Sequence, residues 1–271
     1  MVRRVHDDFS GGTLSVLWTP GTVGGGQVQV GPGVLRLTLP GASADSYADA
    51  QITDYAGLPR SRFPWRPPLH MLVRAWASAG ADSLEGTAGF GFWNDPFMPA
   101  RREIPRLPRA VWFFFGGPRS DMRLALGQPG HGWKAATFDP LRPLFFALLP
   151  LAPLGFLLMR IPALYRALWP LGQRALGVAE AHLPGAWLAE PHTYGLEWRP
   201  DGVAFSVDGK VVLETARSPR GPLGFIAWID NQYAVVMPQG RFGWGLVACQ
   251  EQWLALEQIT IESLSLDHQQ E

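Results

Sequence analysis

The fold is decided by residues 192–210, which read HTYGLEWRPDGVAFSVDGK. Two Asp-Gly pairs, at 201–202 and 208–209, separate short segments in which apolar and polar side chains alternate. An Asp-Gly pair between alternating segments is a strong signal for a β-hairpin, because both residues tolerate the positive φ angles of a tight turn. The stretch therefore predicts three consecutive antiparallel strands, at 192–198, 203–207 and 210–213.

Similar segments occur on both sides of this stretch and are separated by turn residues. They predict further strands at 28–30, 34–39, 71–77, 87–93, 111–115, 223–229 and 259–264. In 87–93 aromatic residues alternate with glycines, and a glycine inside a strand indicates close approach of another backbone or of a ligand. The 31 glycines and 25 prolines are spread over the 271 residues without a period, and 47% of the chain is hydrophobic. This composition favours one many-stranded β domain, 1–271, over a collagen-like or disordered chain.

Charge and cysteine content exclude several classes of protein. The chain has 23 basic and 23 acidic residues, whereas a general nucleic-acid binder carries a basic excess, so no nucleic-acid partner is expected. The single cysteine, Cys249, allows no intrachain disulfide. No secretory signal follows the two arginines near the start, so a cytoplasmic or peripheral membrane location is expected.

Residues 141–189 break the β pattern and are interpreted as a helical insertion. Residues 144–159 are all apolar, Gly or Pro, but this run is shorter than a bilayer span and is interrupted by Pro150 and Pro153. From 160 to 176 the apolar residues follow a helical period, and Pro170 is expected to kink or split that helix. Three interpretations stay open: a hairpin packed on the sandwich, a segment lying in a membrane interface, or a lid over an apolar groove.

The 192–210 stretch resembles the "H-T-Y-x-x-E-W-x-P-D … x-V-D-G" hairpin of family 16 glycoside hydrolases and their concanavalin A-like relatives. The opening around Asp8-Phe9-Ser10-Gly11-Gly12 and Trp18, residues 33–37 and the closing segment 256–264 are similar as well. The resemblance covers most of the chain outside 141–189. It implies a concanavalin A-like jelly roll of two antiparallel sheets, with a ligand groove on the concave face. Because this sandwich hosts lectins, hydrolases and inert modules, the resemblance is weak for function.

The catalytic motif of that family is missing. Retaining members carry Glu-x-Asp-x-x-Glu on a central strand, which places nucleophile and acid about 5–5.5 Å apart. No such spacing occurs, and the corresponding strand, 107–115, is apolar at the acid positions. Hydrolysis by the family mechanism is therefore not expected. If another acid pair replaces it, Asp95 and Asp230 are the candidates.

Two clusters at strand ends combine rings with amides and acids, the mixture that sugar binding needs. Together with Trp112, they give the candidate ligand-binding set: Trp93, Asn94, Asp95, Trp112, Trp228, Asp230, Asn231 and Tyr233. The alternative is that the Asn-Asp and Asp-Asn pairs are turn residues that bind their own backbone. Glu197 is interpreted as a structural acid, since alternation turns one of Glu197 and Trp198 toward the core.

No cofactor is expected, because the six histidines show no metal-ligand spacing and no phosphate loop is present. The family resemblance implies a structural calcium near the termini, for which Asp7 and Asp8 are the candidate ligands. His131 lies in a predicted loop, 129–134. The expected function is non-hydrolytic, lectin-like carbohydrate binding, with a membrane surface as a second partner through 141–176. The alternative is an enzyme with a displaced acid pair, or a binder or catalyst of an apolar metabolite beneath a helical lid.

Overall fold

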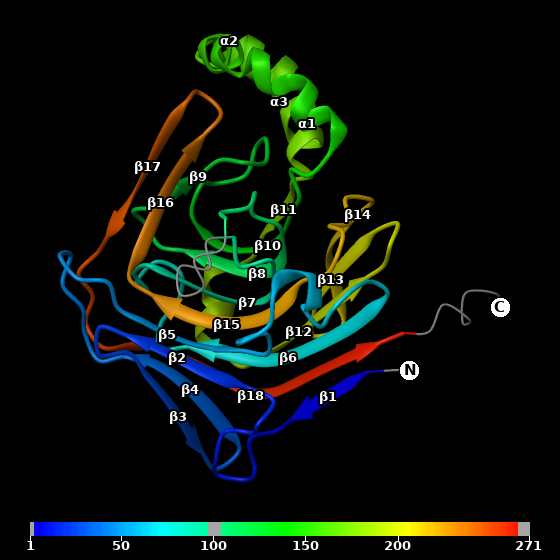
Figure 1. The fold of residues 1–271 in the computed structure, drawn as a ribbon. Coiled ribbons are helices and arrows are strands. Elements are labelled where there is room, and N and C mark those ends of the chain that lie inside the picture. The colour runs from blue at the N-terminus through cyan, green and yellow to red at the C-terminus, as the bar shows by residue number, and fades with distance from the viewer. Residues whose placement is uncertain (1–2, 97–103, 265–271) are drawn as a thin grey trace.

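A computed structural model describes residues 3–96 and 104–264. Within these residues two large antiparallel sheets pack face to face, as the sequence predicts (Figure 1). The eight-stranded sheet has the order β14-β13-β12-β6-β18-β4-β3, with β1 also paired to β18. Its strands are β1 (Arg4–Asp7), β3 (Gln27–Gly31), β4 (Val34–Leu39), β6 (Leu69–Ala77), β12 (His192–Trp198), β13 (Val203–Val207), β14 (Lys210–Thr215) and β18 (Gln252–Ser263).

The seven-stranded sheet has the order β11-β10-β8-β7-β15-β5-β2. Its strands are β2 (Thr19–Val23), β5 (Asp49–Thr53), β7 (Thr87–Trp93), β8 (Ala110–Gly116), β10 (Gly132–Phe138), β11 (Ala179–His182) and β15 (Gly224–Asp230). A third, small sheet stands beside it and consists of β9 (Asp121–Met122), β16 (Gln232–Met237) and β17 (Arg241–Leu246). Short 3-10 turns lie at Arg60–Arg62 and Gly185–Ala189.

The predicted hairpins at 192–210 are confirmed as β12, β13 and β14. Asp208 and Gly209 have φ angles of 48° and 77°, the left-handed geometry that an Asp-Gly turn supplies. The Asp208 carboxylate accepts a hydrogen bond from the Thr193 backbone (2.9 Å) and lies 2.6 Å from His192 Nδ1. These hydrogen bonds lower the pKa of Asp208. The turn is thereby tied back to the start of β12.

The core lies between the two large sheets and is rich in aromatic rings. Phe90, Phe113, Trp133 and Tyr194 are fully buried and form a network of ring contacts 4.9–6.0 Å apart. Strand alternation puts Trp198 in this core and leaves Glu197 exposed, where it accepts a hydrogen bond from Arg199. Each aromatic pair of this kind stabilises the folded state by about 0.5–1.5 kcal/mol more than the burial of its surface alone.

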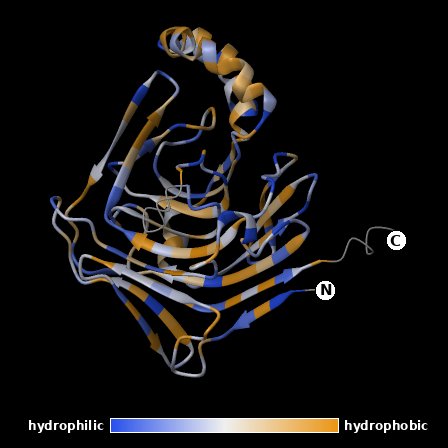
Figure 2. Cartoon of the chain, in the orientation of Figure 1, coloured by the Kyte–Doolittle hydropathy of each residue, from blue (hydrophilic) through white to orange (hydrophobic). Residues whose placement is uncertain are grey.

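The helical insertion is confirmed and is called here the helical arm, residues 143–176. It contains α1 (Pro143–Leu148), a 3-10 turn (Leu149–Leu151), α2 (Ala152–Leu158) and α3 (Pro162–Leu176). Each of these segments has a proline in its first turn, where the missing N–H costs nothing, so the prolines divide the apolar run. Figure 2 shows the hydrophobic residues gathered along this arm.

Two expectations about the insertion need correction. Pro170 does not split α3, which continues to Leu176 and ends at Gly177 in a left-handed cap. The insertion also ends before residue 189, since residues 179–182 return to the seven-stranded sheet as β11, and Leu183 and Leu188 belong to the core. The loop predicted around His131 is likewise shorter, because β10 begins at Gly132.

Candidate functional site

The outer face of the seven-stranded sheet forms the floor of a groove. Side chains alternate along each strand, so Phe113 and Phe115 enter the core while Trp112 and Phe114 point the other way. The strand register aligns the outward residues in rows across the sheet. One row is Thr53, Ile226, Gly91, Trp112, Ala136 and Glu180, and the next is Gln51, Trp228, Gly89, Phe114, Lys134 and His182.

The glycines of β7 belong to this floor and leave no room for a side chain. A Cβ atom on Gly89 would come within 2.9 Å of the Trp228 ring, and one on Gly91 within 2.6 Å of Trp112. The close approach that the alternating glycines predict is therefore made mainly by the backbone of β8, at Phe113 for Gly89 and at Val111 and Trp112 for Gly91, with the Trp228 ring also close to Gly89. Gly91 also has a φ angle of 146°, which side-chain-bearing residues rarely adopt.

The groove floor is an aromatic surface with few free polar groups. Trp112 lies 6.2 Å from Trp93, 5.2 Å from Trp228 and 5.3 Å from Phe114, measured between ring centroids. Trp93 Nε1 donates to the Tyr55 hydroxyl at 2.5 Å, and Trp228 Nε1 donates to Thr87 Oγ1 at 3.0 Å. Because these indole N–H groups already have acceptors, the rings present mainly apolar surface to the groove.

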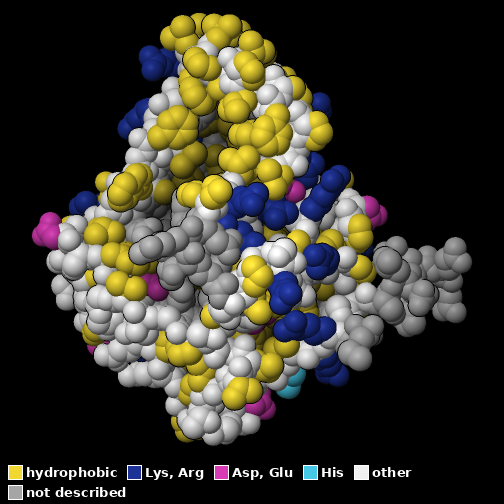
Figure 3. Space-filling view, in the orientation of Figure 1, with side chains coloured by type: hydrophobic (Ala, Val, Ile, Leu, Met, Phe, Trp, Pro, Cys, Tyr) yellow, Lys and Arg dark blue, Asp and Glu magenta, His cyan; other side chains and the backbone are white. Residues whose placement is uncertain are grey.

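A cavity of about 720 Å³ lies above this floor, under the helical arm and beside the β16–β17 hairpin. Most of its lining is aliphatic or aromatic. Apart from the tryptophans, the lining residues with a polar or charged side chain are Arg109, Lys134, Thr137 and Glu180. The arm reaches the hairpin where the Phe156 and Phe242 rings lie 5.4 Å apart. Figure 3 shows apolar side chains over the arm and in the hollow beneath it. Within the described part of the chain, this is an apolar groove with a partial roof.

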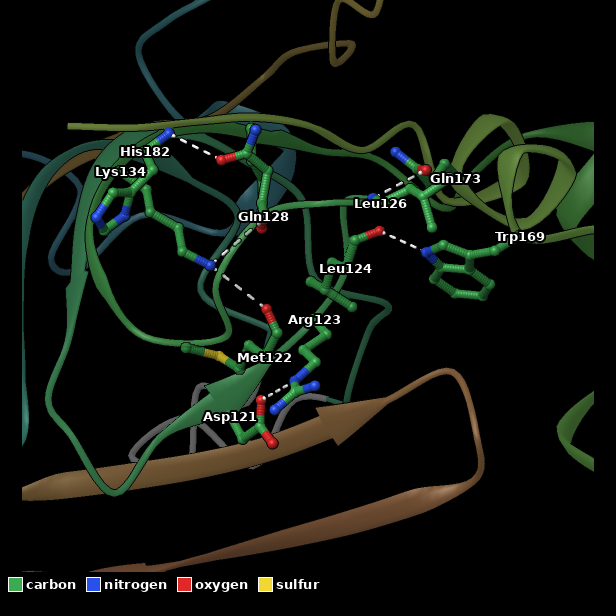
Figure 4. A network of polar contacts seen from close by, with 11 residues as sticks. Asp121, Met122, Arg123, Leu124, Leu126, Gln128, Lys134, Trp169, Gln173 and His182 are labelled. Carbon is green, nitrogen blue, oxygen red and sulfur yellow. Dashed lines mark hydrogen bonds and ion pairs between the residues drawn. The ribbon is translucent and has the colours of Figure 1, made fainter. Parts of the chain in front are cut away.

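The arm is fixed to the sandwich by the loop between β9 and β10 (Figure 4). Trp169, buried on α3, donates from Nε1 to the Leu124 carbonyl at 2.9 Å. Gln173 accepts a hydrogen bond from the Leu126 backbone at 3.1 Å. Two side chains one turn apart on α3 thus hold the arm in place above the groove.

A buried ion pair lies at one side of the cavity. Lys134 Nζ is 3.4 Å from Glu180 Oε2 and 3.4 Å from the Met122 carbonyl, and both charged side chains are almost fully buried. Burial raises the pKa of Glu180, while Lys134 opposes that rise. The partial burial of the His182 ring, with the charges of Lys134 and His131 nearby, lowers the pKa of His182. Sequence reasoning missed this pair because 46 residues separate its members.

The two predicted clusters lie at opposite ends of the groove. Strands β7 and β15 are antiparallel, with Trp93 opposite Gly224 and Thr87 opposite Asp230. Asp95 lies two residues beyond Trp93, so the seven-residue length of the β15 ladder, roughly 20 Å, separates it from Asp230. Asp95 and Asp230 are therefore not the closely spaced pair that glycoside hydrolysis requires. On β8, the residues that face the groove are Ala110, Trp112 and Phe114, none of which is an acid.

The two asparagines of the candidate set hold backbone segments together. Asn94 donates to the Leu107 carbonyl (2.9 Å) and accepts from the Arg109 backbone (2.8 Å). Asn231 accepts from the Ala48 backbone at 2.9 Å, and its amide donates to three carbonyls, of Ser43, Ser46 and Val247, at 3.0–3.1 Å. Neither side chain has appreciable exposure. Both side chains thus have structural partners, but these lie in other segments of the chain rather than in the residues' own turns.

Asp230 is a buried acid beside a second one. It lies opposite Asp49 in the sheet and accepts hydrogen bonds from Thr87 Oγ1 (2.8 Å) and the Gln232 backbone (3.0 Å). Burial raises the pKa of Asp230 to about 6, and burial with the neighbouring Asp230 charge raises the pKa of Asp49 to about 8. Both acids therefore favour the protonated form more than an exposed aspartate does.

The remaining candidates are placed as follows. Asp95 adopts a φ angle of 41°, and its carbonyl accepts hydrogen bonds from Arg60. Tyr233, half-buried on β16, lies over Gly245 of β17. Of the eight predicted ligand-binding residues, Trp93 and Trp112 line the cavity.

The predicted calcium ligands, Asp7 and Asp8, accept hydrogen bonds from nearby groups of the chain. Asp7 accepts hydrogen bonds at both carboxylate oxygens, from the Phe9 backbone (2.9 Å) and Trp18 Nε1 (2.8 Å). Asp8 accepts one from the Ser10 backbone at 3.0 Å. In residues 3–96 and 104–264 no three His, Cys, Asp or Glu side chains are grouped so as to hold a metal ion.

No protein-family model and no curated protein matches the sequence. Solved structures match nearly all of it. The endo-β-1,3-glucanase from Pyrococcus furiosus aligns over 96% of this chain and 94% of its own, with a TM-score of 0.54 and 12% identity. The Crh5 transglycosylase in complex with NAG aligns over 97% and 84%, with a TM-score of 0.52 and 12% identity. The Emp47p carbohydrate recognition domain aligns over 97% and 95%, with a TM-score of 0.50 and 11% identity. The predicted concanavalin A-like fold is confirmed.

Proposed function

We propose that this concanavalin A-like sandwich is a binding protein whose groove takes up the apolar chain of an amphiphilic molecule beneath the helical arm. The observation that carries the proposal is the apolar cavity of about 720 Å³ between the aromatic floor and the arm. Apolar surface removed from water is worth about 25 cal/mol per Å², so a chain that fills such a site gains several kcal/mol. The alternative of an apolar-ligand binder under a lid, raised from the sequence, is thus the one that the geometry favours.

Binding rather than hydrolysis is proposed, because the groove face of β8 carries Ala110, Trp112 and Phe114 where a hydrolase needs acids. Glu180, the acid that lines the cavity, is paired with Lys134. Thr137 donates to the Gly177 carbonyl at 3.1 Å and holds the end of the arm.

A titration with N-phenyl-1-naphthylamine, a dye that brightens in apolar sites, tests the proposal. We expect saturable binding of about one dye per chain, displaced by dodecyl maltoside but not by maltose. This result follows because the alkyl chain, rather than the sugar, matches the lining. A dye signal that never saturates, or that dodecyl maltoside leaves unchanged, contradicts the proposal.

Carbohydrate binding is the second candidate, supported by the Trp93–Trp112–Trp228 surface. Flat indole faces are the side chains on which the C–H faces of sugars stack. Trp93 and Trp112 are half-buried and therefore partly available, whereas Trp228 is buried. Calorimetric titration with laminarin and lichenan separates the two candidates: heat of binding with these glucans, and none with alkyl chains, favours the lectin-like function.

A peripheral membrane location fits the same function. Within the described residues no helix has both the length and the hydropathy to cross a bilayer. The arm nevertheless exposes apolar side chains that do not line the cavity, namely Phe146, Leu157 and Ile161. Between residues 141 and 176 the sequence contains four arginines and no acid, a charge that suits anionic lipid headgroups. We propose that this outward face rests on an anionic membrane surface.

Cosedimentation with anionic liposomes tests the membrane contact. The double variant Leu157→Ser and Ile161→Ser is expected to lower the partition coefficient at least about tenfold, because two apolar side chains no longer enter the interface. Val211→Ser is the matched control, since Val211 is equally exposed but lies on the eight-stranded sheet. If the wild-type protein stays in the supernatant, the membrane proposal is wrong.

A further inference from the structure

We propose that the amphiphile bound in the groove is anionic, and that arginines at the base of the helical arm hold its phosphate-class head. This inference rests on the proposed uptake of an apolar chain and adds the chemistry of the other end of the ligand. The arginines, called here the arginine cluster, come from the residue before β8, the residue before the arm, the end of α3 and the loop between β14 and β15. They are Arg109, Arg142, Arg174, Arg217 and Arg220.

Arg109 connects the cluster to the groove. It lines the cavity, and its Nη1 donates to the Arg220 carbonyl at 2.5 Å. Its Nε is buried and has no hydrogen-bond partner within the described residues. A buried guanidinium N–H without an acceptor is costly, because the group has lost water and gained nothing in exchange. An anionic oxygen at this edge of the groove would supply an acceptor to this guanidinium.

Backbone carbonyls, rather than carboxylates, accept hydrogen bonds from two of the other arginines, Arg142 and Arg217. Arg142 donates to the carbonyls of Asp139 (3.2 Å) and Ser218 (3.4 Å), and Arg217 donates to the carbonyl of Val178. These contacts position the guanidinium groups without neutralising them. In the part of the chain that the structure describes, no arginine of the cluster forms an ion pair with an acid.

The charge of the cluster is poorly balanced. Its nearby acid, Asp139, is buried and accepts hydrogen bonds from the backbones of Leu141 (3.1 Å) and Arg220 (3.2 Å). Burial lowers the pKa of Arg217, and the charges of Arg142 and Arg174 lower it further. Figure 3 shows Lys and Arg side chains gathered beside the hollow, directly under the arm. Five cations around one acid repel one another, and a bound anion relieves that repulsion.

The apolar cavity and the arginine cluster adjoin each other, so one molecule can occupy both. The cavity lining includes the sequence neighbours of the cluster. Pro108 and Ala110 flank Arg109, Phe138 precedes Asp139, and Leu176 lies two residues after Arg174. A ligand whose chain lies on the aromatic floor therefore places its head among the arginines. Arginine suits this role, because its planar N–H groups bind phosphate and carboxylate oxygens in pairs.

Competition for the bound dye by three probes tests the inference: dodecyl phosphate, dodecyl maltoside and inorganic phosphate. We expect dodecyl phosphate to bind at least tenfold more tightly than dodecyl maltoside, and inorganic phosphate to compete only far more weakly. The variants Arg109→Gln and Arg220→Gln should each weaken dodecyl phosphate binding about tenfold, the usual size of a lost charge-assisted hydrogen bond, and change the affinity for dodecyl maltoside much less. Arg4→Gln, an exposed arginine on β1, is the control and should change neither affinity.

Three results would overturn the inference. Equal affinity of the two dodecyl ligands in the wild type, or unchanged dodecyl phosphate affinity in both variants, shows that the head does not reach the arginines. Inorganic phosphate that binds as tightly as dodecyl phosphate shows an anion site without a chain. Failure of the uptake proposal is distinguishable, because in that case dodecyl maltoside and the dye do not bind either. Thermal unfolding of each variant checks that the fold is intact.

Discussion

Replacement of Ala136 by tryptophan is expected to abolish binding of apolar ligands while leaving the sandwich folded. Ala136 lies on β10, between Trp112 of β8 and Glu180 of β11, and its side chain lines the cavity. An indole at this position occupies the space that the ligand chain needs. We expect the dye affinity to fall at least about a hundredfold, which corresponds to about 2.7 kcal/mol of binding free energy.

The stability of the Ala136→Trp variant should change much less, because the new side chain enters open groove rather than packed core. We expect less than about 1 kcal/mol from urea unfolding. Ala204→Trp is the matched control: Ala204 is partly exposed on β13, in the other sheet, and its replacement should leave the dye affinity unchanged. Unaltered dye binding in a folded Ala136→Trp protein would place the ligand elsewhere.

Replacement of Asn231 by alanine is expected to destabilise the protein strongly. The buried amide joins three segments of chain through four hydrogen bonds, to Ala48, Ser43, Ser46 and Val247. Its removal leaves the buried Ala48 N–H and Val247 carbonyl without this partner, while the carbonyls of the exposed Ser43 and Ser46 can turn to water. At about 1–3 kcal/mol for each group left unsatisfied, and with some relief from water entry, the expected loss is about 3–5 kcal/mol. The melting temperature should fall by about 10 °C.

The neighbouring Gln232→Ala variant is the control, since Gln232 is exposed and should change the free energy of unfolding by less than about 0.5 kcal/mol. Chemical denaturation of both variants measures the difference. This prediction also decides between the two interpretations of Asn231. If Asn231→Ala keeps the wild-type stability but loses affinity for a glucan, the asparagine contacts ligand and the carbohydrate interpretation gains support.

The local part of the fold could be predicted from the sequence. The Asp-Gly pair at 208–209, the alternating segments at 34–39 and 87–93 and the prolines of the arm each act within a few residues. Strands such as β10, β11 and β16 were not predicted. They are short or carry mixed residues, and pairing with strands farther along the chain, such as β11 with β10 and β16 with β9, helps to hold them in their sheets.

The candidate site could be predicted less well. Sequence reasoning grouped Trp93, Asn94 and Asp95 with Trp228, Asp230 and Asn231, because both sets follow apolar strands. The antiparallel register of β7 and β15 then separates the two sets along the groove. Hydrogen bonding decides the role of the amides, and neither their type nor their spacing reveals which carbonyls they meet.

The sequence by itself determined a two-sheet β sandwich with one helical, acid-free apolar insertion, since turn chemistry and side-chain periodicity are local properties. Only the tertiary structure decided where that insertion lies and what it covers. Arg109, Lys134 and Glu180 come from distant parts of the chain, and strand register and the anchoring of α3 bring them to one groove. The groove's character depends on which face of each strand turns away from the core, a choice that packing makes and no short stretch of sequence records.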